Sequence, residues 1–302
     1  MTRSPSIPRR SGSIGARADH LPPAVERVEH VMGMPVIVEV CDIGFDETVL
    51  DHLFAWLRFV DETFSTYQQD SDISRLNRGE IALADAHVSV QSVLRRCESL
   101  RRSTRGYFDV AAPMASLGGG VDPSGFVKGW AVEAAGRLLR RAGAKNWCVN
   151  AGGDICLNGA PHGCDFWRVG IQHPVERLAV AAVLGLREGA VATSGAYERG
   201  EHILDPRTGV APEGVLSVTI VGQDLAVADA YATAAFAMGR AGATWAATLQ
   251  GHGAIVIFDD HTISYSAGVE TYLQDADASS SGIDGRLARR SHRRAITIGD
   301  PA

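Results

Sequence analysis

The segment 122–129, DPSGFVKG, joins residues that can hold an anion to the start of a helix. Unpaired backbone N–H groups and the positive end of the helix dipole attract negative charge at such a start. Gly125 allows another group to approach the backbone closely, and Lys128 adds a positive charge one turn into the helix. The segment therefore predicts a phosphate site, with simple helix capping as the alternative. It is neither a Walker A loop nor a Rossmann GxGxxG motif, so its spacing indicates no nucleotide class.

Asp229 and Thr233 lie four residues apart in the segment 226–240, which we expect to be helical. That spacing places both residues on the same helix face. A carboxylate and a hydroxyl are oxygen ligands that Mg²⁺ accepts, with water and phosphate oxygens completing its coordination. The pair predicts a magnesium site, and a threonine hydrogen-bonded back to its own helix is the alternative.

Three further segments combine polar residues with glycines or turns. The run 192–209 contains so many Ser, Tyr, Glu, Arg, His, Asp and Thr residues that a functional role is favoured over a plain surface loop. The segment 64–77 is explained by a helix end leading into a capped turn, although Tyr67 offers an aromatic face to a planar ligand. The segment 150–155, NAGGDI, is explained by a tight turn between two strands.

The elements that position these residues follow from apolar periodicity. Apolar residues at helical spacing predict helices over 46–62, 90–103, 124–142 and 226–240. Apolar runs and alternation predict a strand at 34–40, successive strands across 145–221 and a last hairpin over 253–268. Strands that follow one another without helices between them disfavour parallel βαβ units. We therefore expect an α+β fold.

The five cysteines, at positions 41, 97, 148, 156 and 164, form no CxxC pair and leave an odd number. This pattern argues against a disulfide framework and favours a reducing compartment. The eight-residue spacing of the last three matches no common zinc pattern, so we interpret them as small buried residues on strands.

Composition limits the class of protein. The 302 residues are 45% hydrophobic and 21% charged, which is typical of a globular protein. A net charge of −6 with only two lysines argues against nucleic-acid binding. No stretch approaches the roughly 20 apolar residues of a membrane span, and the first two dozen residues lack the apolar run of an export signal. We therefore expect a cytoplasmic protein.

We expect three regions along the chain. Residues 1–25 are predicted to be a disordered tail, and residues 26–274 to form a single globular domain. Residues 275–302 are rich in Ser, Asp and Gly and then basic, which predicts a second disordered tail, with an anion-binding arm as the alternative.

Eight segments, taken together and in order, resemble the FAD:protein FMN transferases, the ApbE-like flavin transferases. They are Met32-Gly33, 64–77, 106–113, 122–139, 150–155, 169–174, 192–209 and 228–239. Each segment is weak evidence alone, but eight in sequence order are specific. The resemblance extends from about Val31 to Ala267 and so covers nearly all of the predicted globular domain.

The resemblance implies mixed and antiparallel sheets flanked by helices, in a duplicated, T-fold-like arrangement. It also implies a Mg²⁺-dependent transferase that moves FMN from FAD to a Thr or Ser hydroxyl of a target flavoprotein and releases AMP. The implied partners are FAD and the acceptor flavoprotein domain, whose covalent flavinylation is a post-translational modification. The alternatives are an FAD pyrophosphatase, since water can replace the acceptor hydroxyl, and a non-catalytic FAD-binding protein.

Site residues follow from the resemblance position by position. It implies FAD contacts at Met32, Tyr67, Phe108, Asp109, Val110, Asp122, Lys128 and Ile203. The backbone at Gly125, with Asp229 and Thr233, would hold the metal. His202 matches the position expected to act in catalysis as the general base on the acceptor hydroxyl, with Asp205 orienting it.

The chain departs from the family pattern at three places. Ala196 stands where the family usually has Asp, and Ala232 stands where some members add a further acidic residue. The stretch between Pro113 and Asp122 is shorter than the family's common form. Many members are exported or lipid-anchored, and the missing export signal here favours an intracellular target.

Overall fold

The computed structural model describes residues 24–111, 119–176, 178–195, 203–274 and 295–298. Within these residues the helices are α1 (Thr48–Phe64), α2 (Asp72–Asn77), α3 (Val88–Ser103), α4 (Ser124–Arg141), α6 (Leu225–Ala237), α7 (Ala241–Ala246) and α8 (Ala267–Glu270). The strands are β1 (Val25–Val31), β2 (Met34–Val40), β3 (Trp147–Ala151), β4 (Asp154–Asn158), β5 (Trp167–Gln172), β6 (Val180–Leu186), β7 (Glu188–Gly195), β8 (Val215–Gly222), β9 (Gly253–Phe258), β10 (Ile263–Tyr265), β11 (Leu273–Gln274) and β12 (Ala295–Ile298).

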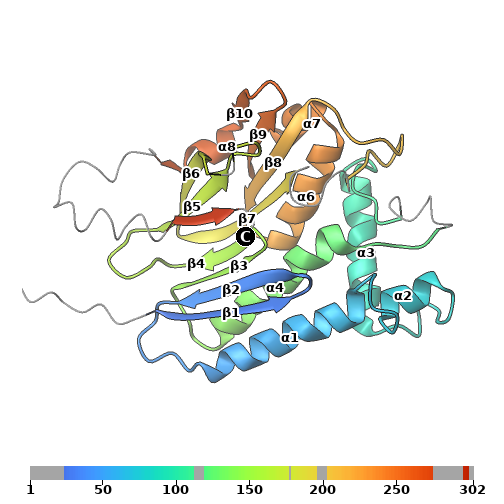
Figure 1. Cartoon of the computed structure of the whole chain (residues 1–302), viewed down its shortest axis with the longest axis horizontal. Coiled ribbons are helices and arrows are strands. Elements are labelled where there is room, and N and C mark those ends of the chain that lie inside the picture. The colour runs from blue at the N-terminus through green and yellow to red at the C-terminus, as the bar shows by residue number, and fades with distance from the viewer. Residues whose placement is uncertain (1–23, 112–118, 177, 196–202, 275–294, 299–302) are drawn as a thin grey trace, which may run out of the picture.

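The described strands form two sheets (Figure 1). The larger has the order β1-β2-β3-β4-β7-β8-β9-β10, and every neighbouring pair in it is antiparallel. The smaller has the order β11-β6-β5-β12, in which β12 runs parallel to β5. The prediction of an α+β fold with antiparallel sheets flanked by helices is confirmed.

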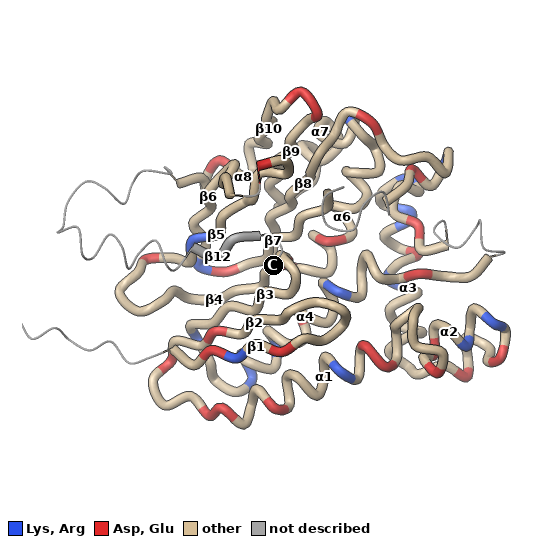
Figure 2. Tube along the Cα trace, viewed as in Figure 1, with Lys and Arg blue, Asp and Glu red and all other residues tan. Residues whose placement is uncertain are grey.

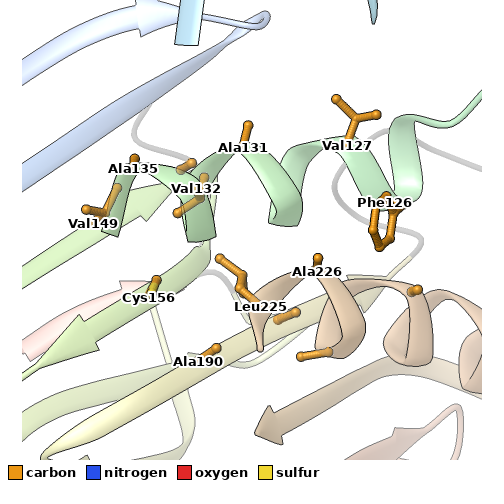
Figure 3. Close-up of a cluster of buried hydrophobic side chains, with 14 of the residues drawn as sticks. Phe126, Val127, Ala131, Val132, Ala135, Val149, Cys156, Ala190, Leu225 and Ala226 are labelled. Carbon is orange, nitrogen blue, oxygen red and sulfur yellow. The ribbon is translucent and has the colours of Figure 1, made fainter. Parts of the chain in front are cut away.

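Two hydrophobic cores lie on opposite faces of the larger sheet. On one face, side chains of α4 and α6 meet those of β3, β4 and β7, as Figure 3 shows for Val149, Cys156 and Ala190. On the other face, the smaller sheet contributes Trp167 and Leu184 to a second core. Neighbouring residues of one strand therefore enter different cores, as alternation along a strand requires.

Helices α4 and α6 cross at very close range. A Cβ atom on Gly129 would lie 2.7 Å from the Leu225 carbonyl oxygen, so only glycine fits there without a shift. One turn later, the buried Glu133 accepts the Leu225 N–H at 3.2 Å, and Asp224 caps α6 by accepting the Val227 N–H at 3.1 Å. This crossing fixes the two helices that carry the predicted phosphate and metal residues.

The predicted helices and strands are present with shifts of a few residues at their ends, but two extended segments differ from expectation. The strand β1 pairs with β2 through a turn at Met32 and Gly33, which have φ values of 57° and 73°. The predicted N-terminal tail 1–25 therefore ends where β1 begins. Within the segment 275–302, predicted to be a disordered tail, the strand β12 pairs with β5. The rest of that tail lies outside the described residues.

Charged residues of both signs are interspersed along α1 and α2 (Figure 2). In the part of the chain that the structure describes, no helix is long and apolar enough to cross a membrane.

Candidate active site

Three segments meet at the start of α4. A Cβ atom on Gly125 would lie 3.4 Å from Thr233 Oγ1 on α6 and 3.6 Å from the Phe108 ring. The Oγ of Ser194, at the end of β7, lies 3.4 Å from the same Thr233 hydroxyl. The structure thus brings the predicted metal residues Gly125 and Thr233 together with the predicted FAD contact Phe108.

The connection before α4 is held on two sides. Asn77, at the end of α2, exchanges two hydrogen bonds with the backbone of Val121, at 2.8 and 2.9 Å. The Asp122 N–H donates to the Val110 carbonyl at 2.7 Å. The Asp122 carboxylate accepts the Ser124 N–H at 3.0 Å and also binds the Ser124 hydroxyl. Asp122 therefore caps the first turn of α4, which supports the capping interpretation of this residue.

Lys128 is ion-paired inside the protein. Its Nζ lies 3.0 Å from Oδ2 of Asp154, whose side chain is 1% exposed, compared with 18% for Lys128. Asp154, the first residue of β4, also accepts the Thr193 N–H at 3.3 Å and lies next to the Asp229 carboxyl, to which it can hydrogen-bond when one of the two carboxyls carries a proton. Burial raises the pKa of Asp154, and the Lys128 ammonium opposes that shift. Lys128 and Asp229 thus share one neighbour.

Asp229 is fixed between the two crossing helices. Its carboxylate accepts the Gly129 N–H at 3.1 Å, and its side chain is 4% exposed. When Asp229 and Asp154 are both ionised, their two negative charges exceed the single positive charge of Lys128. A divalent cation would balance this excess, because oxygen donors such as the Asp229 carboxylate and the Thr233 hydroxyl suit Mg²⁺.

The side chains at this site supply a part of the ligands that a metal ion needs. The described residues contain no group of three or more His, Cys, Asp or Glu side chains that could hold a metal ion. A cation bound by Asp229 and Thr233 would therefore need backbone, water or phosphate oxygens as well, which is how Mg²⁺ is usually bound beside a nucleotide. The residues present fit a magnesium ion that arrives with a pyrophosphate.

The remaining predicted FAD contacts differ in their surroundings. Met32, Val110 and Ile203 are partly buried against the main core, on three separate segments. Asp109 accepts the Ala111 N–H at 2.9 Å. Tyr67 follows the end of α1 and is 91% exposed, so its ring is open to a ligand and is not packed into the site by the described residues.

Asp205 braces its own turn. Its carboxylate accepts the Arg207 N–H at 2.9 Å, and its N–H donates to the Val210 carbonyl at 2.9 Å. Arg207 in turn donates to the Tyr107 hydroxyl at 2.7 Å and lies over that ring, which ties this turn to the segment containing Phe108. His202 lies outside the described residues, so an interaction between it and Asp205 stays a prediction.

Of the positions that depart from the family pattern, the structure describes some and leaves out others. Ala196 lies outside the described residues, as does most of the short connection before Asp122. Ala232 is fully buried within α6, next to Thr233.

Sequence reasoning missed Asp154 and Ser194 as site residues. It treated Asp154 as part of a glycine turn and of a segment that carries the family resemblance, without a role of its own, although an Asp at the start of the apolar strand DICLN signals a buried charge that needs a partner. Ser194 lies in the run 192–209, for which a functional role was predicted, but it was given no role of its own, because only the fold brings the end of β7 beside Thr233.

Comparisons with known proteins identify the family. The family model described as the ApbE family matches residues 32–120 and 114–257, and the chain belongs to this family. A relative from Vibrio cholerae named FAD:protein FMN transferase is 29% identical over 249 residues, which cover 64% of this chain and 73% of the relative. A relative of the same name from Rhodobacter capsulatus is 33% identical over 199 residues, covering 63% of this chain and 34% of the relative.

Solved structures share the fold. The flavin transferase ApbE from Vibrio cholerae superposes with a TM-score of 0.73 at 24% identity, covering 83% of this chain and all of that one. The ApbE protein from Thermotoga maritima gives a TM-score of 0.75 at 23% identity, covering 84% of this chain and all of that one. These likenesses confirm the α+β architecture.

Proposed function

We propose that the protein is a Mg²⁺-dependent FAD:protein FMN transferase. It moves FMN from FAD to a Thr or Ser hydroxyl of an acceptor flavoprotein and releases AMP. The observation that carries this proposal is the meeting of Lys128, Asp229 and Thr233 beside the start of α4, in a chain of the ApbE family.

The start of α4 and Lys128 bind the pyrophosphate of FAD in this proposal. Helix N–H groups and an ammonium favour the negative charge that builds up on the phosphoryl oxygens. Asp229, Thr233 and the Gly125 backbone hold Mg²⁺, which neutralises phosphoryl charge when bound. The remaining contacts to FAD are assigned to Met32, Tyr67, Phe108, Asp109, Val110, Asp122 and Ile203.

The transfer step exchanges one phosphorus–oxygen bond for another. The acceptor hydroxyl oxygen attacks the phosphorus of the FMN half of FAD, and the bond from that phosphorus to the bridging oxygen breaks. His202 takes the hydroxyl proton as general base, and AMP leaves with the bridging oxygen. Asp205 orients His202, and its braced turn supports this role by fixing the backbone three residues further along the chain.

We place this activity in the cytoplasm. All five cysteines are free thiols, and four of them are buried, which suits a reducing compartment. The acceptor is then an intracellular flavoprotein domain with an accessible Thr or Ser.

The test is incubation of the purified protein with FAD, Mg²⁺ and a candidate acceptor domain, followed by mass spectrometry of the acceptor and measurement of AMP. We expect an acceptor mass increased by one FMN group and an equal amount of AMP. AMP and free FMN without any modified acceptor, across a panel of flavoprotein domains, would indicate a pyrophosphatase instead. Bound FAD that is never cleaved would indicate a binding protein.

A further inference from the structure

Asp154 is a buried carboxylate that three elements enclose. Its side chain is 1% exposed, and it contacts Lys128 of α4, Thr193 of β7 and Asp229 of α6. The strand pairing of β4 does not require a carboxylate here, because Asp154 pairs with Ala151 through backbone groups alone. Removing a carboxylate from water is costly, so a merely structural position would be filled more easily by an apolar side chain.

Through its contacts to Lys128 and Asp229, Asp154 links the proposed pyrophosphate site to the proposed metal site. Lys128 carries its ammonium on a flexible four-carbon stem, whose many conformations would otherwise spread the charge over a large volume. The ion pair at 3.0 Å anchors that ammonium to the rigid start of β4. The Asp229 carboxyl is held by the same residue and by the Gly129 N–H of α4.

We propose that Asp154 is a positioning residue, which fixes the Lys128 ammonium and the Asp229 carboxyl relative to each other. This inference rests on the proposed function, since it assigns Lys128 to the pyrophosphate and Asp229 to the metal. In this proposal Asp154, which is 1% exposed, touches neither FAD nor Mg²⁺ itself. Its effect on FAD binding passes through Lys128, and its effect on the metal passes through Asp229.

A double-mutant cycle on FAD affinity tests the first path. FAD is titrated at a Mg²⁺ concentration that saturates every variant, into wild type, Lys128→Ala, Asp154→Asn and the double variant, with flavin fluorescence as the readout. We expect Lys128→Ala to weaken FAD binding about tenfold to a hundredfold, the scale of a charged hydrogen bond. Asp154→Asn should weaken it about tenfold, and the double variant should bind no more weakly than Lys128→Ala alone.

The second path is tested by the Mg²⁺ concentration that gives half-maximal FAD binding. Asp154→Ala should raise that concentration several-fold, because alanine has no polar group that can hold the Asp229 carboxyl, whereas an asparagine amide could still donate a hydrogen bond to it. This readout does not depend on turnover, and a residue that only supports the fold would not move it.

Glu133→Gln is the matched control. Glu133 is also a buried carboxylate on this helix pair, and it accepts the Leu225 N–H at 3.2 Å. Its substitution should lower the thermal midpoint while leaving FAD affinity unchanged. If Asp154→Asn does not fold because Lys128 is left unpaired, Lys128→Met with Asp154→Leu removes both charges. This pair should restore folding and bind FAD as weakly as Lys128→Ala.

The outcomes separate this inference from the proposed function. Wild type that neither binds nor cleaves FAD would overturn the proposed function and this inference with it. Wild type that binds FAD, together with an Asp154→Asn variant that binds FAD equally well and an Asp154→Ala variant with an unchanged Mg²⁺ requirement, would overturn the inference alone. Effects of Lys128→Ala and Asp154→Asn that simply multiply in the double variant would also overturn it, because the two residues would then act independently.

Discussion

At the scale of single residues, the candidate site depends on side chains that are already in place before any ligand binds. Asp229 is held by the Gly129 N–H, and the Gly125 backbone faces Thr233. Preorganised groups of this kind stabilise charge in a transition state without a further cost of ordering them. Substitutions here should therefore change chemistry more than stability.

Asp229→Asn should remove the metal dependence and most of the activity together. The amide keeps a hydrogen-bond acceptor for the Gly129 N–H at 3.1 Å, so the fold is retained, but it lacks the negative charge that binds Mg²⁺. AMP release measured across a Mg²⁺ series checks this. Asp224→Ala is a control on the same helix, where loss of the cap should cost about 1 kcal/mol of stability and leave the metal optimum unchanged. Wild-type AMP release by Asp229→Asn, with the same metal optimum, would refute the ligand assignment.

His202→Ala should slow FMN transfer by about 10² to 10⁴, the usual contribution of a general base, while FAD still binds. If His202 takes the acceptor proton, wild-type transfer should rise with pH through a group that titrates near 6.5, roughly the ordinary pKa of His. The measurement is the rate of acceptor flavinylation between about pH 5 and 8, where His titrates. Asp205→Asn, which keeps the hydrogen bond to the Arg207 N–H, tests the orienting role separately. An undiminished rate in His202→Ala would require that another group acts as the base.

At the scale of elements, the crossing of α4 and α6 decides how the phosphate and metal residues meet. Gly129 and Gly125 lie one turn apart on α4, but they face different neighbours. A Cβ at Gly129 would lie 3.0 Å from the Ala226 Cα, whereas a Cβ at Gly125 would make a contact of 3.4 Å with Thr233 Oγ1. The first glycine is required by packing, and the second borders the site.

Gly129→Ala should therefore destabilise the protein by roughly 1 to 2 kcal/mol, because overpacking costs more than the gain in helix propensity. Gly125→Ala should leave the thermal midpoint unchanged or slightly higher, but its methyl group would cover one side of the Thr233 hydroxyl and lower AMP release. Thermal unfolding and FAD cleavage are measured on both variants. Equal losses of stability in the two variants would show that Gly125 is also a packing residue.

The sequence predicted these helices well because their apolar residues repeat at helical spacing. The Ser124–Arg141 helix and the position of Lys128 within it were both visible in this way. The ion pair between Lys128 and Asp154 was not, because it joins α4 to a strand 26 residues later and depends on the packing of the whole sheet. The strand β1 was missed because its apolar residues, in VERVEHV, recur at every third position and not in the alternation typical of a strand, and its partner had to be known first.

At the scale of the whole molecule, buried cysteines lie in both hydrophobic cores. Cys97 and Cys156 belong to the core under the helices, whereas Cys41 and Cys148 belong to the core between the sheets. Burial raises the pKa of Cys97 to about 12 and raises the pKa of Cys148 and Cys156 as well. Cys164 is the exposed thiol of the five.

In the native protein, we therefore expect one thiol to react rapidly with a disulfide reagent at pH 8, and all five to react after denaturation. Buried thiols with raised pKa hold almost no thiolate, which is the reactive form. Cys164→Ser should abolish the rapid reaction. A second rapid thiol in that variant would show that one of the buried positions is open to solvent.

The slow reaction of the remaining thiols then measures whether the two cores open together. On β4, Ile155 lies in the core between the sheets and Cys156 lies in the core under the helices. On β3, Cys148 lies in the core between the sheets and Val149 lies in the core under the helices. Because the same strands line both cores, opening one core should disrupt the other. In Cys164→Ser, labelling of Cys148 and Cys156 at increasing urea should give the same free energy of opening within about 1 kcal/mol, with the same dependence on urea. A much lower free energy for Cys148 would show instead that the smaller sheet detaches on its own while the helices that carry the site stay folded.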